Sequence, residues 1–342
     1  MNRKKFLGAV SLFILSVSFA AADYERPAKI VMLWDYISEK EDNLLPEKKI
    51  VPNGLDVVSP TWFSIGSEDA DVSSLADREY VLWAHDNGLE VWALFENRSD
   101  NWLTFWALFN ESKRKKIVEQ IAGFVLEYNL DGINVDFELM EPPTGKLFEK
   151  LIVELYERLK PLGITLSVDI PIPIRDIREV YDIALVADNS DYIVIMAYDQ
   201  HHGESKLIGP VAAIDWVKKG IEDTLEYVHC KKVILGIPFF TRVWLENREG
   251  GKFVLTSEFK GMKEAYKMFE GTARFWGRDR ATEQIYAEYD DDLKCYKVWL
   301  EDDHSISLKL DTVNDCYLAG MSAWRRGLEW DEIWDMINAY FD

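Results

Sequence analysis

The stretch DGINVDFE, residues 131 to 138, decides the fold class of this chain. Its apolar residues are Ile133, Val135 and Phe137, and the positions between them carry an amide and two carboxylates. Successive side chains of a strand point to opposite faces, so the pattern predicts a strand with one apolar and one polar face. A buried polar face costs free energy unless partners or a ligand compensate. The stretch therefore predicts a strand that carries a functional site.

Other apolar stretches of strand length occur along the chain, with helical patterns between them. Together the eight strand-like stretches are 29–37, 55–66, 90–97, 131–139, 164–172, 192–200, 231–240 and 319–327. Amphipathic helical patterns cover 112–129, 145–163, 212–228 and 329–341. Eight such alternations predict an α/β fold, a (β/α)8 TIM barrel. An open dinucleotide-binding sheet is disfavoured, because no G-x-G-x-x-G opens a helix after the first strand.

The interval between the seventh and eighth strand-like stretches is too long for a single helix. It contains a helical pattern, MKEAYKMF, and a segment that alternates like two antiparallel strands with a turn at 290–292. We therefore predict a small α+β insertion at about 245–310. We expect this insertion to build one wall of a cleft, and a purely stabilising appendage is the alternative.

The N-terminus carries the pattern of a secretory signal peptide. Arg3, Lys4 and Lys5 precede the apolar run FLGAVSLFILSVSF, and small residues at 20–22 suit cleavage before Asp23. The run is shorter than the ~20 apolar residues that a membrane span needs. We therefore predict a signal peptide at 1–22 and a mature chain of 23–342. This chain would be exported to the periplasm, the cell envelope or the medium, without a membrane anchor.

Composition excludes several classes of function. The formal net charge of −21 argues against nucleic acid and anionic membranes as partners. The chain has 13 Trp and is 48% hydrophobic, which is ample material for a large core. Three Cys (230, 295 and 316) form no zinc pattern, and leave one disulfide or free thiols as alternatives. We expect no metal or other cofactor.

The active site of a barrel enzyme lies at the carboxyl ends of its strands. Polar and aromatic residues at those ends are Asp35, Tyr36, Trp62, Ser64, Glu96, Asn97, Asp136, Glu138, Asp169, Tyr198, Asp199, Gln200, Thr241, Arg242, Trp324 and Arg325. Carboxylates with aromatic platforms suit a carbohydrate hydrolase, and Mg²⁺-assisted chemistry is the competing use.

Asp136 and Glu138 form the strongest pair among these residues. On one face of a strand they would lie about 7 Å apart. Glycosidases need a protonated acid for the leaving oxygen and a second group that acts at the anomeric carbon. Asp136 is expected to raise the pKa of Glu138. The alternative is that both acids pair with basic residues inside the barrel.

Several stretches resemble glycoside hydrolase family 18, the chitinase and N-acetylglucosaminidase family. DGINVDFE resembles the D-x-x-D-x-D-x-E signature, IVIMAYD (193–199) resembles the M-x-Y-D of the sixth strand, and Trp324 in MSAWRRGLE occupies the place of the eighth-strand Trp. The stretches DVVSPTWF, GIPFFTRVW and YKVWLEDDHSISLK are similar to the spore-germination, cortex-lytic branch. The likeness runs from about residue 28 to 340.

The resemblance implies substrate-assisted, retaining hydrolysis of β-linked N-acetylglucosamine-containing glycans. Glu138 would protonate the glycosidic oxygen and then deprotonate water, while the acetamido oxygen of the sugar attacks the anomeric carbon. Asp136 would hold the acetamido N–H, and Tyr198 would hydrogen-bond its oxygen. Trp324 would form the floor beneath the sugar, with an ordinary core Trp as the alternative.

The resemblance also implies a set of substrate-binding residues. Met196 and Asp199 would line the pocket, although core packing is an equal alternative for Met196. Arg242 either reaches the sugar or forms a salt bridge with Glu301 or Asp302. Asn134, placed with the substrate-binding residues, is a departure, because typical chitinases carry Asp there. An amide cannot share a proton with Asp136, so the pH optimum is expected to differ.

The substrate class stays open at this point, since peptidoglycan fragments, chitooligosaccharides and N-glycan cores all contain the 2-acetamido sugar. Two alternative functions also fit the sequence. The first is a catalytically inactive chitinase-like protein that only binds sugar, and the second is a metal-dependent barrel enzyme.

Overall fold

The computed structural model describes residues 29–44, 50–172, 174–249, 252–291 and 294–341. The predicted signal peptide, 1–22, lies outside the described residues. In the described part of the chain, no helix combines the length and the apolar character that crossing a membrane requires.

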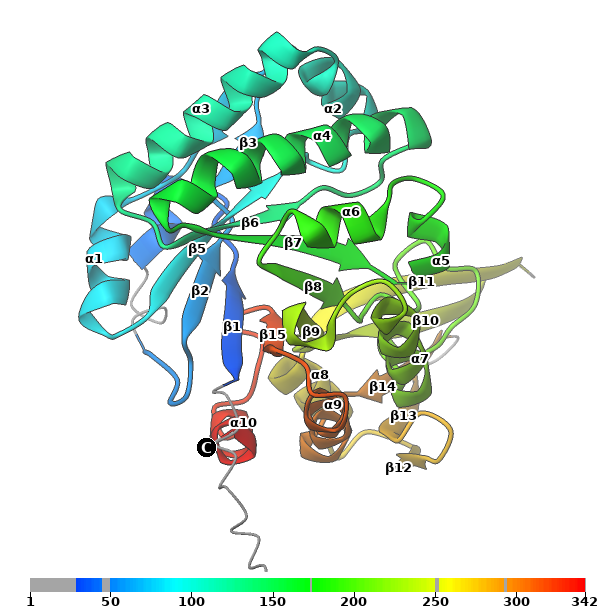
Figure 1. Cartoon of the computed structure of the whole chain (residues 1–342). Coiled ribbons are helices and arrows are strands. Elements are labelled where there is room, and N and C mark those ends of the chain that lie inside the picture. The colour runs from blue at the N-terminus through cyan, green and yellow to red at the C-terminus, as the bar shows by residue number, and fades with distance from the viewer. Residues whose placement is uncertain (1–28, 45–49, 173, 250–251, 292–293, 342) are drawn as a thin grey trace, which may run out of the picture.

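A closed ring of parallel strands forms the centre of the molecule (Figure 1). The strands are β1 (Ile30–Asp35), β2 (Val57–Pro60), β5 (Glu90–Glu96), β6 (Gly132–Asp136), β7 (Thr165–Pro171), β8 (Tyr192–Met196), β9 (Val233–Pro238) and β15 (Gly320–Trp324). They follow the order β2-β1-β15-β9-β8-β7-β6-β5, and pairing of β2 with β5 closes the ring. This confirms the predicted (β/α)8 barrel. Each strand-like stretch of the sequence contains one of these strands.

The second stretch, 55–66, is not one continuous strand. Chain direction changes at Thr61 and Trp62, so the stretch holds β2 and a short β3 (Phe63–Ile65). β3 pairs with the end of β5 and with β4 (Val72–Ser74), which extends the sheet at the carboxyl end of the barrel.

Helices surround the ring, and α3 and α4 cover the strands β5 to β7 in Figure 1. The helices are α1 (Arg78–Asp86), α2 (Asn101–Leu108), α3 (Glu111–Tyr128), α4 (Pro142–Leu159), α5 (Ile174–Ile177), α6 (Ile183–Asp188), α7 (Ile214–Leu225), α9 (Asp303–Asp315) and α10 (Ile333–Phe341). The four amphipathic patterns of the sequence correspond to α3, α4, α7 and α10, within a few residues at each end. Capping explains the sharp start of α3, since Asn110 Oδ1 accepts a hydrogen bond from the Lys113 N–H.

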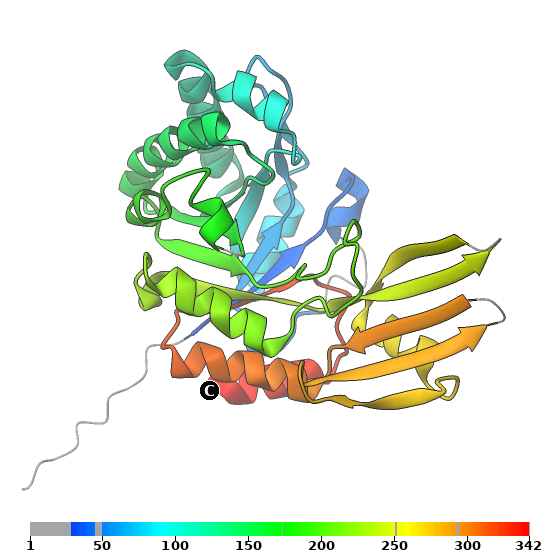
Figure 2. The ribbon, with the colours of Figure 1, turned by 90° about the vertical axis from the view of Figure 1, so that its right-hand side faces the viewer.

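A second, antiparallel sheet projects from one side of the barrel (Figure 2). It consists of β10 (Phe240–Glu249), β11 (Lys252–Gly261), β12 (Phe275–Asp279), β13 (Gln284–Asp291) and β14 (Lys294–Leu300), and α8 (Met262–Phe269) packs against it. This is the α+β insertion between the seventh and eighth barrel strands. Its sheet begins at Phe240 and ends at Leu300, earlier than the expected limits of about 245 and 310. The C-terminal limit differs because residues after Leu300 form α9, which contacts β9, β15 and α7 and so belongs to the barrel.

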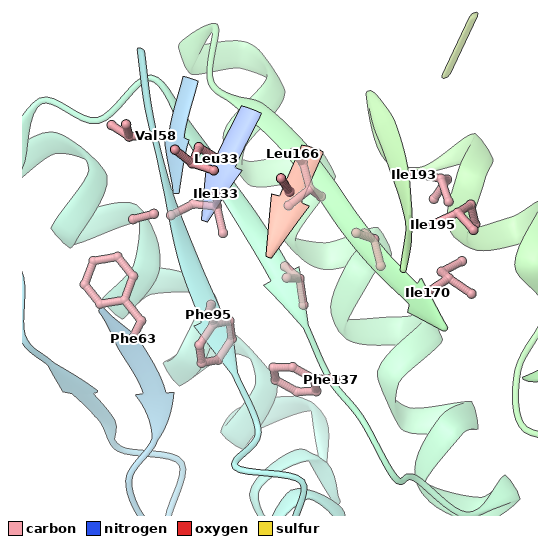
Figure 3. Packing of buried hydrophobic residues seen from close by; sticks show 14 of the residues in the cluster. Leu33, Val58, Phe63, Phe95, Ile133, Phe137, Leu166, Ile170, Ile193 and Ile195 are labelled. Atoms are coloured by element: carbon pink, nitrogen blue, oxygen red, sulfur yellow. The ribbon is translucent and has the colours of Figure 1, made fainter. Parts of the chain in front are cut away.

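The apolar core has two parts that the alternation of the strands separates. One lies between the ring and the helices, and Figure 3 shows Ile133 and Phe137 of the central stretch within it. The other fills the inside of the ring and consists of Met32, Trp34, Val57, Trp92, Leu94, Val194, Met196 and Ile234. The polar face of β6 therefore points into the barrel, where it meets this inner cluster.

Candidate active site

Strand β6 ends at Asp136, which is paired with Glu96 at the end of β5. Glu138 lies beyond the strand, and the next residue, Leu139, has a left-handed φ of 51°. The strand alternation that the sequence predicted therefore ends at Asp136 and does not set the position of Glu138. A residue after the neighbouring strand β5 holds Glu138 instead.

Asn97, directly after β5, fixes the backbone at Glu138 from both sides. Its Oδ1 accepts a hydrogen bond from the Glu138 N–H at 3.0 Å, and its Nδ2 donates to the Glu138 carbonyl at 2.9 Å. The Asn97 side chain is fully buried, and Nδ2 also donates to Thr104 Oγ1 at 3.0 Å. Ser99, two residues further on, donates from Oγ to Glu138 Oε2 at 3.3 Å. We therefore regard Asn97 as the residue that positions Glu138.

Asn134 of β6 points into the interior of the barrel. It is fully buried, its Oδ1 accepts from Trp34 Nε1 at 2.9 Å, and its Nδ2 donates to Ser167 Oγ at 3.0 Å and to Asp169 Oδ1 at 2.6 Å. Both polar atoms of the Asn134 side chain are therefore engaged within the protein, and its amide supports Asp169. The substrate-binding role of Asn134 stays a prediction.

The buried acids of this region have raised pKa values. Burial raises the pKa of Asp136 well above its usual range, and the charges of Glu138 and Asp169 add to the effect. Burial likewise raises the pKa of Asp169, against the hydrogen bond from Asn134. For Glu138 burial is again the largest cause; the Ser99 hydrogen bond opposes it, and the charge of Asp199 adds to it. The expected direction for Glu138 holds, but burial rather than the charge of Asp136 is its main origin.

A cavity of about 340 Å³ lies at the carboxyl ends of the strands, and among the three acids above, Asp136 is the one that lines it. Asp136 and Trp324 line it, together with Glu96 and Arg98 of the β5 side and Tyr36 after β1. Asp136 Oδ1 is buried and, among the described residues, has no hydrogen-bond partner. An orphaned acceptor beside a cavity is ready to receive a donor from a ligand.

Trp324 is the aromatic residue of β15 that lines this cavity, and further aromatic rings pack behind it toward β8. Trp324 ends β15 and is half-buried, with its ring centroid 6.0 Å from that of Trp34. Tyr198 follows β8, and its ring meets Trp34 edge-on at 6.3 Å and Phe240 at 5.8 Å. Burial raises the pKa of the Tyr198 phenol well above its usual range, and the charge of Asp136 adds to this, so the hydroxyl stays a hydrogen-bond donor.

The remaining predicted residues lie around these groups but differ in exposure. Met196 is 5% exposed and belongs to the inner apolar cluster, which favours the packing alternative for it. Asp199 is exposed at the rim and adopts a left-handed φ of 60°. Arg242 of β10 donates from Nη1 to Ser257 Oγ at 3.2 Å. Burial of the carboxylate raises the pKa of Asp199, and the charge of Arg242 opposes this rise.

The alternative salt bridges of Arg242 are wrong. Glu301 pairs instead with Lys309 at 2.8 Å, and Asp302 pairs with Arg278 at 2.6 Å. Arg242 therefore stays on the side of the insertion that borders Asp199.

The sequence left a disulfide and a metal-dependent site open as alternatives. All three cysteines are free, so no disulfide forms. Within the described ranges, no group of three or more His, Cys, Asp or Glu side chains is arranged to hold a metal ion.

Asn97, Asp169 and Glu96 are the residues of this site to which the sequence assigned no role. All three are among the polar residues at strand ends, so the sequence predicted that they lie at the carboxyl end of the barrel. The sequence did not predict their contacts, because hydrogen bonds between neighbouring strands depend on register and side-chain direction.

The fold and the site together define a barrel with clustered acids and aromatic walls, which is the arrangement of a glycoside hydrolase. The family profile described as Glycosyl hydrolases family 18 matches residues 63–329. The chain belongs to this family, and the resemblance noted from the sequence is confirmed.

Individual relatives share low sequence identity with this chain. The chain is 22% identical over 276 residues to a Bacillus subtilis protein described as uncharacterized glycosylase YvbX, covering 77% of this chain and 78% of that one. It is 20% identical over 244 residues to the Cortical fragment-lytic enzyme of Bacillus subtilis, covering 69% of this chain and 55% of that one. The crystal structure of the Bacillus cereus spore cortex-lytic enzyme SleL is similar with a TM-score of 0.80 at 18% identity, covering 92% of this chain and 75% of that one. The chain thus spans about half to three quarters of these relatives.

Proposed function

We propose that this glycosidase cleaves β-linked N-acetylglucosamine-containing glycans with retention of configuration and with the help of the substrate's own acetamido group. Glu138 gives its proton to the glycosidic oxygen and later takes one from water. Asp136 holds the acetamido N–H and stabilises the developing positive charge, and Tyr198 donates to the acetamido oxygen. Trp324 lies beneath the sugar ring as its floor.

The observation that carries this proposal is the group of Asp136, Glu138 and Asp169, whose pKa values burial raises and which form no ion pair with a Lys or Arg of the described chain. A general acid must hold its proton near neutral pH, and burial of Glu138 favours the protonated form. Asp136 offers an orphaned oxygen to a donor from the ligand. The Lys and Arg side chains that form salt bridges in the described chain pair with other acids, for example Glu154, Glu301 and Asp35.

Peptidoglycan fragments and chitooligosaccharides are the proposed substrates. Support for the first comes from the name of the cortical fragment-lytic relative, and support for the second from the chitinases among the relatives. Export by a signal peptide, proposed from residues 1–22, would bring the enzyme to such polymers.

The test compares N-acetylglucosamine oligomers with the same oligomers after removal of the N-acetyl groups. We expect the acetylated oligomers to release reducing ends at least about 10³-fold faster, because a positioned internal nucleophile replaces a bimolecular step. The first product observed by NMR should be the β-anomer. Equal rates, or an initial α-anomer, would overturn the mechanism. Binding of the oligomers without any release of reducing ends would favour the sugar-binding alternative.

A further inference from the structure

A second cavity lies beside the one that contains Asp136. Its volume is about 910 Å³, which is large enough for a drug-sized or peptide-sized group. Tyr36 lines both cavities. Trp324, the last residue of β15, lines the first cavity, and Arg325, the residue after it, lines the second. A sugar seated on Trp324 would therefore have the second cavity as its immediate neighbour.

Arg325 is the distinctive group at this junction. Its guanidinium is half-buried and lies over the ring of Tyr36, 4.9 Å from the centroid. In the part of the chain that the structure describes, no carboxylate lies within ion-pair distance of it. Burial lowers the pKa of the Arg325 guanidinium, and the charges of Asp35 and of Glu329, which lines the same cavity, oppose this. A partly desolvated guanidinium that stacks on an aromatic ring and has no ion-pair partner in the described chain is suited to a planar carboxylate from outside.

The other cations of the second cavity already have acids. Arg326 donates from Nη1 to Asp35 Oδ2 at 3.2 Å, in the buried interior below β1. Lys263 Nζ lies 3.8 Å from Asp331 Oδ2, and both residues line the cavity. Among the cations that line this cavity, Arg325 is the one without an ion-pair partner in the described chain, and it directly follows Trp324. Asp42, Glu329, Asp331 and Asp335 also line the cavity. A carboxylate close to Trp324 would therefore meet Arg325, and the rest of the substituent would occupy the remaining volume.

We propose that Arg325 binds a carboxylate carried by the sugar next to Trp324, and that the second cavity accommodates the group bearing this carboxylate. The favoured substrates are then N-acetylated glycans with acidic substituents, such as the lactyl group of N-acetylmuramic acid with or without its peptide. Unsubstituted N-acetylglucosamine polymers carry no charge and would leave Arg325 without a partner. This inference rests on the proposed function, because it names the substrate class of the same site.

The experiment uses three soluble substrates: a β-linked glycan fragment with free lactyl carboxylates, the same fragment with these groups converted to methyl esters, and an N-acetylglucosamine oligomer of equal length. Wild type should have a KM for the acid fragment at least about tenfold below that for its ester. Arg325→Gln should raise the KM for the acid fragment about tenfold more than the KM for either neutral substrate. Arg325→Lys, which keeps the charge, should recover part of the difference.

Arg158→Gln is the matched control, because it removes the same charge on α4 from a surface pair with Glu119. It should leave the preference for the acid fragment unchanged. If wild type treats acid and ester alike, or if Arg325→Gln changes all three substrates equally, the inference fails while the proposed function stands. If no substrate is cleaved but calorimetry shows Arg325-dependent binding of the acid fragment, the proposed function fails and the carboxylate site stands.

Discussion

Two clusters of buried acids in this molecule are built in opposite ways. At the base of the insertion, fully buried Glu301 accepts from Lys309 Nζ at 2.8 Å, from Ser305 Oγ at 2.6 Å and from Gln284 Nε2 at 2.8 Å. In the barrel, Asp169 accepts from the amide of Asn134, and Asp136 keeps an orphaned oxygen. Glu301 thus has a cation and three hydrogen-bond donors, whereas in the described chain Asp136 and Asp169 have no cation partner and each keeps one buried oxygen without a hydrogen bond.

The difference separates an acid that holds the fold from acids that are available for chemistry. A buried carboxylate with a cation is neutralised as a pair, so its removal mainly destabilises the protein. Burial raises the pKa of Glu301 as well, but Lys309 opposes that rise, whereas no cation opposes it at Asp136 and Asp169. Ionisation of these two acids therefore disfavours the folded state. Such groups cluster at functional sites. Three substitutions test this contrast.

The largest effect is expected for Glu138→Gln. Loss of the general acid should lower kcat by about 10²- to 10⁴-fold, because the leaving oxygen no longer receives a proton. Release of reducing ends from N-acetylglucosamine oligomers measures this, and circular dichroism checks the fold. Glu141→Gln, three residues further on and exposed, is the control that should keep its activity. Turnover close to wild type in Glu138→Gln would remove the assignment of the acid.

A smaller effect, on stability rather than chemistry, is expected for Glu301→Gln. The substitution leaves Lys309 charged and buried without its acid, so the free energy of unfolding should fall by about 3 kcal/mol. Urea unfolding measures this, and kcat at a temperature where the variant is folded should stay near wild type. A large loss of kcat in folded protein would contradict the division between the two clusters.

The smallest effect is expected for Asp169→Asn and depends on pH. Burial raises the pKa of Asp169 in the folded protein above the ordinary value that the unfolded chain retains. Between these two values the folded protein binds more protons, so wild-type stability falls as pH rises through this window. Asn does not titrate, and the variant should be more stable than wild type by on the order of 1 kcal/mol at pH 8.

This advantage should shrink toward pH 4, where Asp169 is protonated in the folded protein. Urea midpoints at pH 4, 6 and 8 give the comparison. A stability difference that does not vary with pH would show that Asp169 is not held with a raised pKa.

The architecture could be predicted from the sequence to a large extent. The spacing of apolar stretches located the eight barrel strands and the helices α3, α4, α7 and α10. The alternation around 290–292 located the antiparallel pair of β13 and β14. These signals work because helices and strands have short, regular periods that burial imposes on nearby residues. The DGINVDFE motif likewise located the acids, since the resemblance identified the strand end that carries them.

The sequence by itself therefore determined the barrel, the insertion and the strand that bears Asp136. Only the tertiary structure decided how Glu138 is held, that the Asn134 amide supports Asp169, and that Arg325 forms no ion pair within the described chain. Asn97 and Glu138 are 41 residues apart, and their hydrogen bonds exist only because β5 and β6 pair in one register. Local periodicity carries no record of such contacts, because they arise from the packing of elements that are distant along the chain.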